Sequence, residues 1–542
     1  MRILLGLLGL LLFYIALTLA VMEAGVRLLR LAPPAESPGY FWRVPDPITG
    51  WTFEPGAQGR WFNAMYEYDL DVSINELGLR SPASIRYEKP ADAFRVIVLG
   101  DSFVEGIQVT LEETFPQQLS QHLQQLASKP GVEPRRIEVI SAGAGGWGND
   151  QQLLWLRHEG VKYQPDLVIV AFYPANDFHN NHMPLEFANV GAVRKPWFSL
   201  ENGELTLHNF PFDPNEARET ARLLRRQLAV GASGSPAAAG SAPLRVLDPL
   251  GDWLYRHSTL MRYIDPRVRI SWSGLAIRLG RWGLLEPGKE TAEAAMGPDY
   301  IPIAFGAYRQ PPTAEWETAF LVTGEIFRSI QTEAAAMGAR AAGVVLTAAE
   351  QVDENSWRQI LTDYPAMQHH AWSLEQPSAK AMELFTAAGM PALDLGPVFR
   401  QGVAQGAILH LQHDGHWTPA GHALAGAALA DFVLHEGLTP FPAPAGVAVI
   451  VPAGAWSLWH WIGWVVLTLL GVSLAWSLYQ TGPLAWLRHL GVRLGTAGEL
   501  VGQVIHHRQY LLLPLVIILL LFGGLLMIAQ ASVVGPFIYT LF

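Results

Sequence analysis

Cysteine is absent from the 542 residues of this sequence. Disulfides, thiolate metal ligands and cysteine nucleophiles are therefore excluded. Charge is also scarce, because charged residues make up 16% of the chain and hydrophobic residues 50%, whereas about a quarter of an average soluble protein is charged. This shortage of charge indicates membrane segments in addition to a soluble domain.

Basic residues are too few for a protein that binds nucleic acid. The chain has 37 Lys and Arg against 48 Asp and Glu, a formal net charge of −11, and it has no run of Lys or Arg that would form a basic patch. A phosphate backbone would be repelled. The length exceeds what one ordinary core fills, which predicts two or more structural units.

Three long apolar segments are predicted to cross a membrane. They are an N-terminal anchor in residues 1–30 and two C-terminal segments, 456–478 and 510–530. Each reaches the roughly 20 residues that a hydrocarbon core about 30 Å thick requires. A cleaved signal peptide is the alternative for the first segment. Its apolar run is longer than the usual h-region of about 7–15 residues and no clean Ala-x-Ala site follows, which favours an uncleaved anchor.

Short-loop charge predicts the orientation of these segments. The loop over residues 479–509 contains three arginines, Arg488, Arg493 and Arg508. Basic loops stay in the cytoplasm, so the large central region and the tail 531–542 are predicted to lie on the periplasmic or extracytoplasmic side of the cell (inner) membrane. Arg27 and Arg30 flank the first segment on its outer side and favour the opposite orientation.

Residues 91–440 alternate continuous apolar strands with amphipathic helices. This alternation is typical of a parallel α/β sheet that helices cover on both faces. The predicted strands cover residues 94–100, 136–143, 165–173, 341–348 and 391–396. The predicted helices cover residues 111–127, 149–160, 314–338, 376–388 and the segment that follows the turn at residue 414.

Less regular segments surround and interrupt this domain. Residues 31–90 form a lead-in rich in Pro, Trp and Tyr, predicted to contain short strands. An insertion at about residues 178–310 contains a predicted hairpin with its turn at Asn202-Gly203. It also contains the low-complexity stretch "GASGSPAAAGSAP", predicted to be a flexible linker. Residues 441–455 form a Pro/Ala/Gly linker.

The stretch "VIVLGDSFVEG" ends an apolar strand abruptly at Gly-Asp-Ser, residues 100–102. A serine at the carboxyl end of a parallel strand lies where open α/β sheets bind their ligands. A nucleophilic serine needs this exposure, a base and oxyanion donors. The tripeptide alone is common by chance and fits a polar turn equally well. Its interpretation therefore depends on the residues that follow the other strands.

Later segments contain groups that would complete such a site. The second strand leads into the glycine-rich "SAGAGGWGND", whose backbone N–H groups can approach a substrate closely, and the third leads to Asn176. Asp414 and His416 precede the last helix of the domain. A nucleophile, oxyanion donors and an Asp/His pair would thus meet at one edge of the sheet, as acyl transfer requires.

These residues resemble the SGNH (GDSL-type) hydrolases, in a membrane-anchored bacterial form. Four family blocks match in the family's order, namely Gly100-Asp101-Ser102-Phe103, "SAGAGG" with Gly146 as the best-aligned glycine, Asn176-Asp177, and Asp414-Gly415-His416. The resemblance covers roughly residues 90–437. The chain departs from the family pattern in two places. Pro174 replaces the usual glycine of block three, and one residue rather than two separates Asp414 from His416.

The resemblance implies a flavodoxin-like three-layer sandwich and a catalytic triad. Ser102 would attack an ester carbonyl, His416 would take its proton, and Asp414 would orient the imidazole. The N–H groups of Ser102 and Gly146 and the side chain of Asn176 would form the oxyanion hole. The resemblance implies no metal and no cofactor.

Other polar residues near these blocks are assigned structural roles. Asp101 and Asp177 are interpreted as local hydrogen-bond anchors rather than catalytic acids. His410, His413 and His422 lie close in sequence to the Asp/His pair, and a metal cluster is the alternative interpretation. A metal would need further carboxylate or imidazole partners, which the sequence pattern does not place, and this disfavours a metal.

Residues 508–542 are similar to a small membrane protein of unknown role found beside carbamoyltransferases and SGNH proteins in bacterial gene clusters. The chain is thus interpreted as a fusion of two parts, with membrane partner proteins expected at its C-terminal helices.

The preferred function is a membrane-anchored serine esterase that removes acyl groups, mainly acetyl, from an envelope or extracellular glycan or a small ester. The alternatives are an O-acyltransferase with the same triad and a non-catalytic scaffold in a membrane complex, against which the intact Ser/Asn/Asp/His set argues.

Overall fold

The computed structural model describes residues 2–35, 39–128, 135–231, 247–286 and 288–441. The chain divides into two compact units, one of Met1–Leu29 with Gly454–Phe542 and one of Arg30–Ala453. In the first unit the described part is the helix α1 (Arg2–Leu29). Among the residues that can be described in full, no helix is long and apolar enough to cross a membrane. The predicted C-terminal membrane segments, their loop, the tail and the preceding linker after residue 441 lie outside the described residues.

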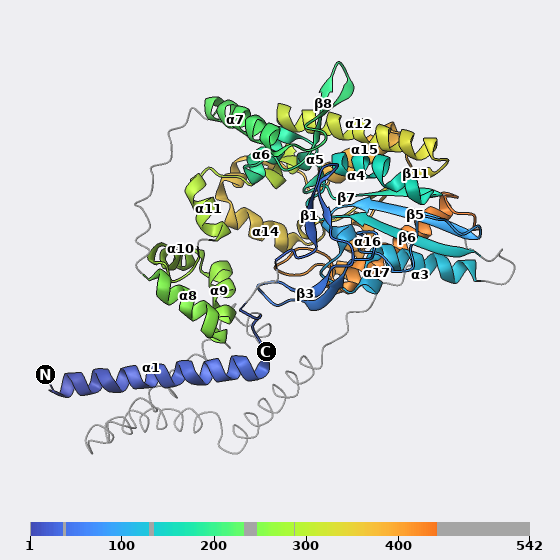
Figure 1. The fold of residues 1–542 in the computed structure, drawn as a ribbon. Coiled ribbons are helices and arrows are strands. Elements are labelled where there is room, and N and C mark those ends of the chain that lie inside the picture. Colours follow the sequence, from blue (N-terminus) through green and yellow to red (C-terminus); the bar gives the residue numbers. More distant parts are fainter. Residues whose placement is uncertain (1, 36–38, 129–134, 232–246, 287, 442–542) are drawn as a thin grey trace, which may run out of the picture. The chain divides into compact units, whose positions relative to one another are not determined.

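A five-stranded sheet forms the centre of the second unit (Figure 1). Its strands are β5 (Ala93–Gly100), β6 (Arg136–Gly143), β7 (Leu167–Phe172), β11 (Arg340–Val345) and β13 (Ala392–Asp394). They lie in the order β13-β11-β7-β5-β6, and every neighbouring pair is parallel. The order reverses between β5 and β7, because β6 is added on one side of β5 and all later strands on the other. Doubly wound sheets bind ligands just beyond the carboxyl ends of the strands at this reversal.

Helices cover both faces of the sheet. One layer consists of α3 (Phe115–Ala127), α16 (Gly396–Ala404) and α17 (Pro419–His435), and the other of α4 (Asn149–His158), α12 (Ala314–Ala336) and α15 (Gln376–Ala387). In β5, Val96 and Val98 face the first layer, whereas Ile97 and Leu99 face the second, and all four are fully buried. Successive side chains of a strand point to opposite faces, so a sheet covered twice needs a continuous apolar run. The predicted parallel α/β sheet is confirmed.

The lead-in folds as two antiparallel hairpins. The first pairs β1 (Arg43–Asp46) with β2 (Gly50–Phe53), and the second pairs β3 (Gln58–Phe62) with β4 (Asp69–Ser73). Trp42, just before β1, is fully buried and shares a core with β5, β7 and the α4/α12 layer. The short strands predicted for residues 31–90 are thus present, and they pack on the main domain.

The insertion after β7 is mostly helical. It starts with α5 (Asp177–Asn180) and α6 (Met183–Val190), followed by the antiparallel hairpin β8 (Trp197–Glu201)–β9 (Glu204–His208). Asn202 and Gly203 both have positive φ, 55° and 86°, as a two-residue hairpin turn requires, so the predicted turn is confirmed. Further helices follow, α7 (Pro214–Gly231), α8 (Asp248–His257), α9 (Thr259–Ser271), α10 (Ser273–Trp282) and α11 (Lys289–Met296). Nearly all of the low-complexity stretch lies outside the described residues.

Several short elements lie between the main helices and strands after the insertion. They are the antiparallel pair β10 (Arg309–Gln310)–β12 (Ala371–Trp372) and the helices α13 (Ala349–Val352) and α14 (Glu354–Asp363).

Thr418 caps the last helix, because its side chain accepts the N–H of Gly421 and Pro419 occupies the first helical position. These are standard start signals for a helix. They end the preceding turn at a defined residue and so hold His416 just outside α17.

Candidate active site

Ser102 is the first residue of the short helix α2 (Ser102–Glu105), directly after β5. The carboxylate of Asp101 caps this helix by accepting the N–H of Phe103 at 2.9 Å. Glycine is required at position 100, because a Cβ there would lie 2.3 Å from Cγ2 of Val104. The strand can therefore turn at once into the helix, which leaves Ser102 partly exposed at the edge of the sheet.

The structure brings Ser102, His416 and Asp414 together. Nε2 of His416 lies 2.7 Å from Oγ of Ser102, and Nδ1 lies 2.5 Å from Oδ1 of Asp414. An ionised carboxylate can only accept hydrogen bonds, so Nδ1 carries the ring proton and Nε2 of the neutral ring accepts from the serine hydroxyl. This is the geometry in which an imidazole can remove a proton from a serine.

The lead-in surrounds the carboxylate of this trio. The hydroxyl of Tyr68 donates to Oδ2 of Asp414 at 2.9 Å, and the carboxylate of Glu67 accepts the N–H groups of His413 and Asp414, both at 3.0 Å. Burial alone would raise the pKa of Asp414, but the hydrogen bond and charge of His416 and the bond from Tyr68 lower it. The carboxylate therefore stays ionised. No motif in the sequence marks Glu67 or Tyr68, and the sequence analysis missed both.

The two further oxyanion donors predicted from the sequence border one cavity of about 550 Å³. Asn176 follows β7, and its Nδ2 donates to Oδ2 of Asp101 at 2.8 Å. That bond uses one amide hydrogen and leaves the second for a ligand. Gly146 has φ of +80°, a conformation that residues other than glycine rarely adopt. The serine, Gly146 and Asn176 thus come from the ends of β5, β6 and β7, as the sheet order requires.

Asp101 and Asp177 anchor the loops around these residues. Asp177 accepts the N–H of Tyr173 at 2.8 Å, and both carboxyl groups are completely buried. Burial raises the pKa of Asp101 and, more strongly, that of Asp177. Their contacts hold Phe103, Tyr173 and Asn176 in place.

A buried carboxylate, Glu105, links Ser102's helix to the glycine-rich loop and to the lead-in. Its Oε2 accepts the N–H of Gly145 at 2.5 Å and contacts Nη2 of Arg43 at 3.3 Å, while Oε1 accepts the indole N–H of Trp42 at 2.7 Å. Three donors thus converge on one carboxylate, which is completely shielded from solvent. Gly145 directly precedes Gly146, so Glu105 sets the position of the predicted oxyanion donor.

Replacing Glu105 by glutamine is expected to lower kcat for an aryl acetate at least tenfold while changing KM little. A glutamine offers one acceptor and one NH2 group to three donors, so either Trp42 or Gly145 loses its partner. Loss of a single oxyanion donor costs about 10²–10³ in kcat in comparable sites, and displacement of one costs part of that. Steady-state kinetics measure the effect. The exposed Glu112→Gln serves as the matched control, and an unchanged kcat in Glu105→Gln would show that Gly146 does not depend on this contact.

The histidines near the trio have different surroundings. His410 contacts the carbonyl of Thr347 through Nε2 at 3.1 Å, and burial lowers its pKa to about 4. His422 accepts the N–H of Phe115 at 3.2 Å through Nδ1, and burial, with the charge of His416, lowers its pKa to about 3. His413 is exposed. Within the described ranges, no group of His, Asp or Glu could hold a metal ion.

Acidification is expected to destabilise the folded domain partly through His422. Its pKa is about 3 when folded and about 6.5 when unfolded, so the unfolded chain binds the proton first as the pH falls. Stability therefore rises with pH in this window. Between pH 7 and pH 5 the loss from this residue should be about 2 kcal/mol. Denaturant unfolding at both pH values should show a smaller drop for His422→Gln than for wild type, and equal drops would contradict the expectation.

The comparisons with known proteins agree with this geometry in part. Residues 358–445 match the family described as "SGNH hydrolase-like domain, acetyltransferase AlgX". The matched segment includes Asp414 and His416 and covers less than half of the chain. It supports the resemblance to SGNH hydrolases and an enzyme that acts on acyl esters. Residues 494–542 match a family of unknown function, DUF5989. Among the curated proteins, none matches the chain.

A solved structure also resembles part of the chain. The lipase/acylhydrolase from Enterococcus faecalis aligns over 65% of this chain and 100% of its own, with 14% sequence identity and a TM-score of 0.28. Likeness at this level supports no statement about activity, which has to be derived from the site itself.

Proposed function

We propose that this protein is a serine-dependent esterase that removes acyl groups, mainly acetyl, from an envelope or extracellular glycan. The observation that carries the proposal is the contact of 2.7 Å between Oγ of Ser102 and Nε2 of His416, whose Nδ1 is held by Asp414. The cavity beside Gly146 and Asn176 supports a substrate larger than the acyl group alone.

The proposed reaction has two halves. Oγ of Ser102 attacks the ester carbonyl as Nε2 of His416 takes its proton, and the carbonyl oxygen becomes an oxyanion facing the N–H of Gly146 and the amide of Asn176. Collapse of this intermediate breaks the bond to the alcohol oxygen, which receives the proton from His416. Water then attacks the acyl-serine with His416 again as base, releasing the carboxylic acid and regenerating Ser102.

An acyltransferase is the second candidate. It shares the acyl-enzyme, but a sugar hydroxyl takes the place of water in the second half. The name of the family matched by residues 358–445 includes an acetyltransferase, which favours this candidate. Product analysis with an acetyl donor and a free oligosaccharide distinguishes the two. Free acetate as the main product supports the esterase, and an acetylated oligosaccharide supports the transferase. If the folded protein forms neither product, both candidates are refuted.

We further propose that the catalytic domain faces away from the cytoplasm, with membrane partners at the C-terminal segments. The arginines of the 479–509 loop support this orientation. Alkaline phosphatase fused after residue 440 should be active, and the same enzyme fused near Thr496 should be silent. Inverted signals would place the domain in the cytoplasm and remove an envelope glycan as its substrate.

A further inference from the structure

The cavity of about 550 Å³ beside the oxyanion donors is larger than the triad requires. Its volume falls in the range of about 300–1,000 Å³ typical of small-ligand pockets. Gly146 and Asn176 line the cavity and Ser102 does not, so an acetyl group bound at Ser102 would lie at its edge and would not fill it. The remaining volume must therefore receive another part of the substrate, and the chemistry of its walls indicates which part.

The floor of the cavity is polar. His179 and Asn180 line it while only 3% and 5% exposed. Nε2 of His179 contacts Nδ2 of Asn189 at 3.2 Å, and Asn189 lies exposed on the rim of the cavity. Buried polar atoms normally have partners, and leaving them without one is costly. The exposed amide of Asn189 can both donate and accept hydrogen bonds, so a ligand that carries hydroxyl groups fits this part of the cavity better than an apolar one.

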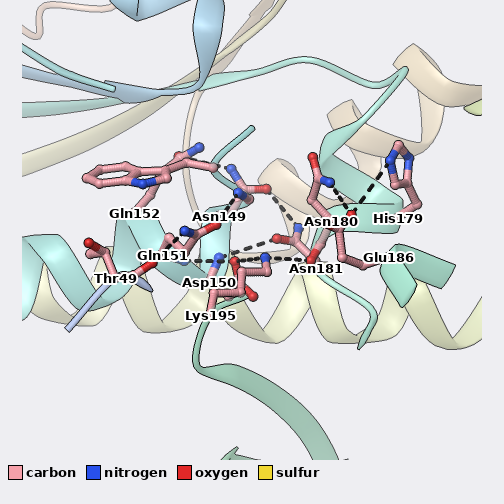
Figure 2. Close-up of polar contacts among 12 residues, drawn as sticks. Thr49, Asn149, Asp150, Gln151, Gln152, His179, Asn180, Asn181, Glu186 and Lys195 are labelled. Atoms are coloured by element: carbon pink, nitrogen blue, oxygen red, sulfur yellow. Dashed lines mark hydrogen bonds and ion pairs between the residues drawn. The ribbon is translucent and has the colours of Figure 1, made fainter. Parts of the chain in front are cut away.

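A buried network holds this floor in place (Figure 2). Nδ2 of Asn180 donates to Glu186 at 2.6 Å, and Nζ of Lys195 donates to the backbone carbonyl of Asn180 at 2.7 Å. Lys195 also pairs with Asp150 at 2.7 Å, and both charged side chains are almost completely buried. The floor is therefore rigid before a ligand arrives, which lowers the entropic cost of binding.

The walls add flat apolar surfaces to this polar floor. Trp51, Tyr173 and Phe305 line the cavity together with the carboxyl groups of Glu186 and Glu350. A pyranose ring has the complementary surface, with apolar C–H faces that pack on aromatic rings and hydroxyl groups around its edge. An alkyl acyl chain would instead leave the polar floor unpaired.

The charges around the cavity do not select an anion. The wall residue Arg43 already contacts Glu105 at 3.3 Å. His179 is neutral, because burial and the charge of Lys195 lower its pKa to about 3. Arg194 also lines the cavity but is exposed to solvent, where its charge is screened. Two carboxyl groups share the space, so a neutral ligand fits it best.

We propose that this cavity binds a neutral pyranose ring of the glycan, the ring whose hydroxyl carries or receives the acyl group, through Asn189 and Glu186. This inference rests on the proposed function and assigns the sugar to this side of the site. The acyl group then lies at Ser102, and the carbonyl oxygen between them faces Gly146 and Asn176.

The test compares two esters with the full-length protein in detergent. The first kind of ester is p-nitrophenyl acetate, which lacks a sugar. The second kind is a panel of mono-O-acetylated methyl hexopyranosides. Two variants are tested, Glu186→Gln, which keeps the acceptor for Asn180, and Asn189→Ala on the exposed rim. For each variant we compare kcat/KM for the best sugar ester with kcat/KM for the aryl ester. The ratio of the first to the second should fall at least tenfold in both variants, mainly through a higher KM for the sugar ester. The exposed Glu354→Gln on α14 should leave this ratio unchanged.

Fluorophosphonate labelling of Ser102 checks that each variant is folded. If Glu186→Gln labels slowly, Asn189→Ala decides the result. If the variants are labelled and their ratio equals that of the wild-type protein, the inference is overturned. It is also overturned if the wild-type protein cleaves the aryl ester but none of the sugar esters. In both cases the esterase proposal survives. A wild type that cleaves neither ester and resists labelling refutes the esterase itself and the inference with it.

Discussion

Replacing Ser102 by alanine is expected to lower the hydrolysis of an aryl acetate by several orders of magnitude, as loss of a triad serine does elsewhere. The hydroxyl lies 2.7 Å from Nε2 of His416 at the end of β5, and no acyl-serine can form without it. The measurement is kcat with saturating ester. Labelling by a fluorophosphonate probe should disappear in the same variant, because the probe reacts with the activated hydroxyl.

A matched control separates this effect from damage to the fold. Ser128, at the exposed end of α3, bonds the carbonyl of Gln124 at 2.8 Å, and Ser128→Ala should keep wild-type kinetics and labelling. If Ser102→Ala kept more than about a tenth of wild-type activity, another residue would have to supply the nucleophile, and the proposed function would need a different mechanism.

Replacing His416 by alanine should reduce activity nearly as far as Ser102→Ala, because serine and base act as one unit. His413→Ala should keep most activity. The physical reason is geometry, since His416 bridges Ser102 and Asp414 whereas the side chain of His413 is exposed. Steady-state kinetics on the same ester measure both variants. An inactive His413→Ala beside an active His416→Ala would discard the assigned base.

The backbone at His413 is held independently of its side chain, which makes the comparison clean. The N–H of His413 and that of Asp414 both bind Glu67 at 3.0 Å. A side-chain substitution at position 413 leaves these backbone bonds intact. Any large loss in His413→Ala would therefore report on the side chain itself rather than on the turn.

Much of the fold follows from local sequence pattern. The run Val96–Leu99 is apolar on both faces, and two helix layers bury it from both sides. Asn202-Gly203 determines its hairpin turn because both residues tolerate positive φ. The helix α16 (residues 396–404), however, is not among the elements predicted from the sequence, which ends a strand at residue 396 and assigns no element to the residues directly after it. Short helices are missed more easily than long periodic ones, even where a proline marks the first turn as it does here.

The sequence by itself also predicted which residues would meet at the candidate site. Ser102, Asn176, Asp414 and His416 each follow or precede an element whose pattern is readable, and parallel strands bring their carboxyl ends to one edge. What only the tertiary structure decided is their surroundings. Trp42, Glu67 and Tyr68 come from lead-in segments with no motif, and they reach Glu105 and Asp414 through contacts more than 60 residues apart in sequence.

The cavity floor was equally invisible in the sequence. Asp150 and Lys195 form a buried pair across separate elements, and the positions of His179 and Asn180 depend on their contacts with Asn189 and Lys195. Periodicity reports only which face of an element is apolar. It does not report which polar side chains from distant segments meet on the buried side, because long-range packing alone sets those distances.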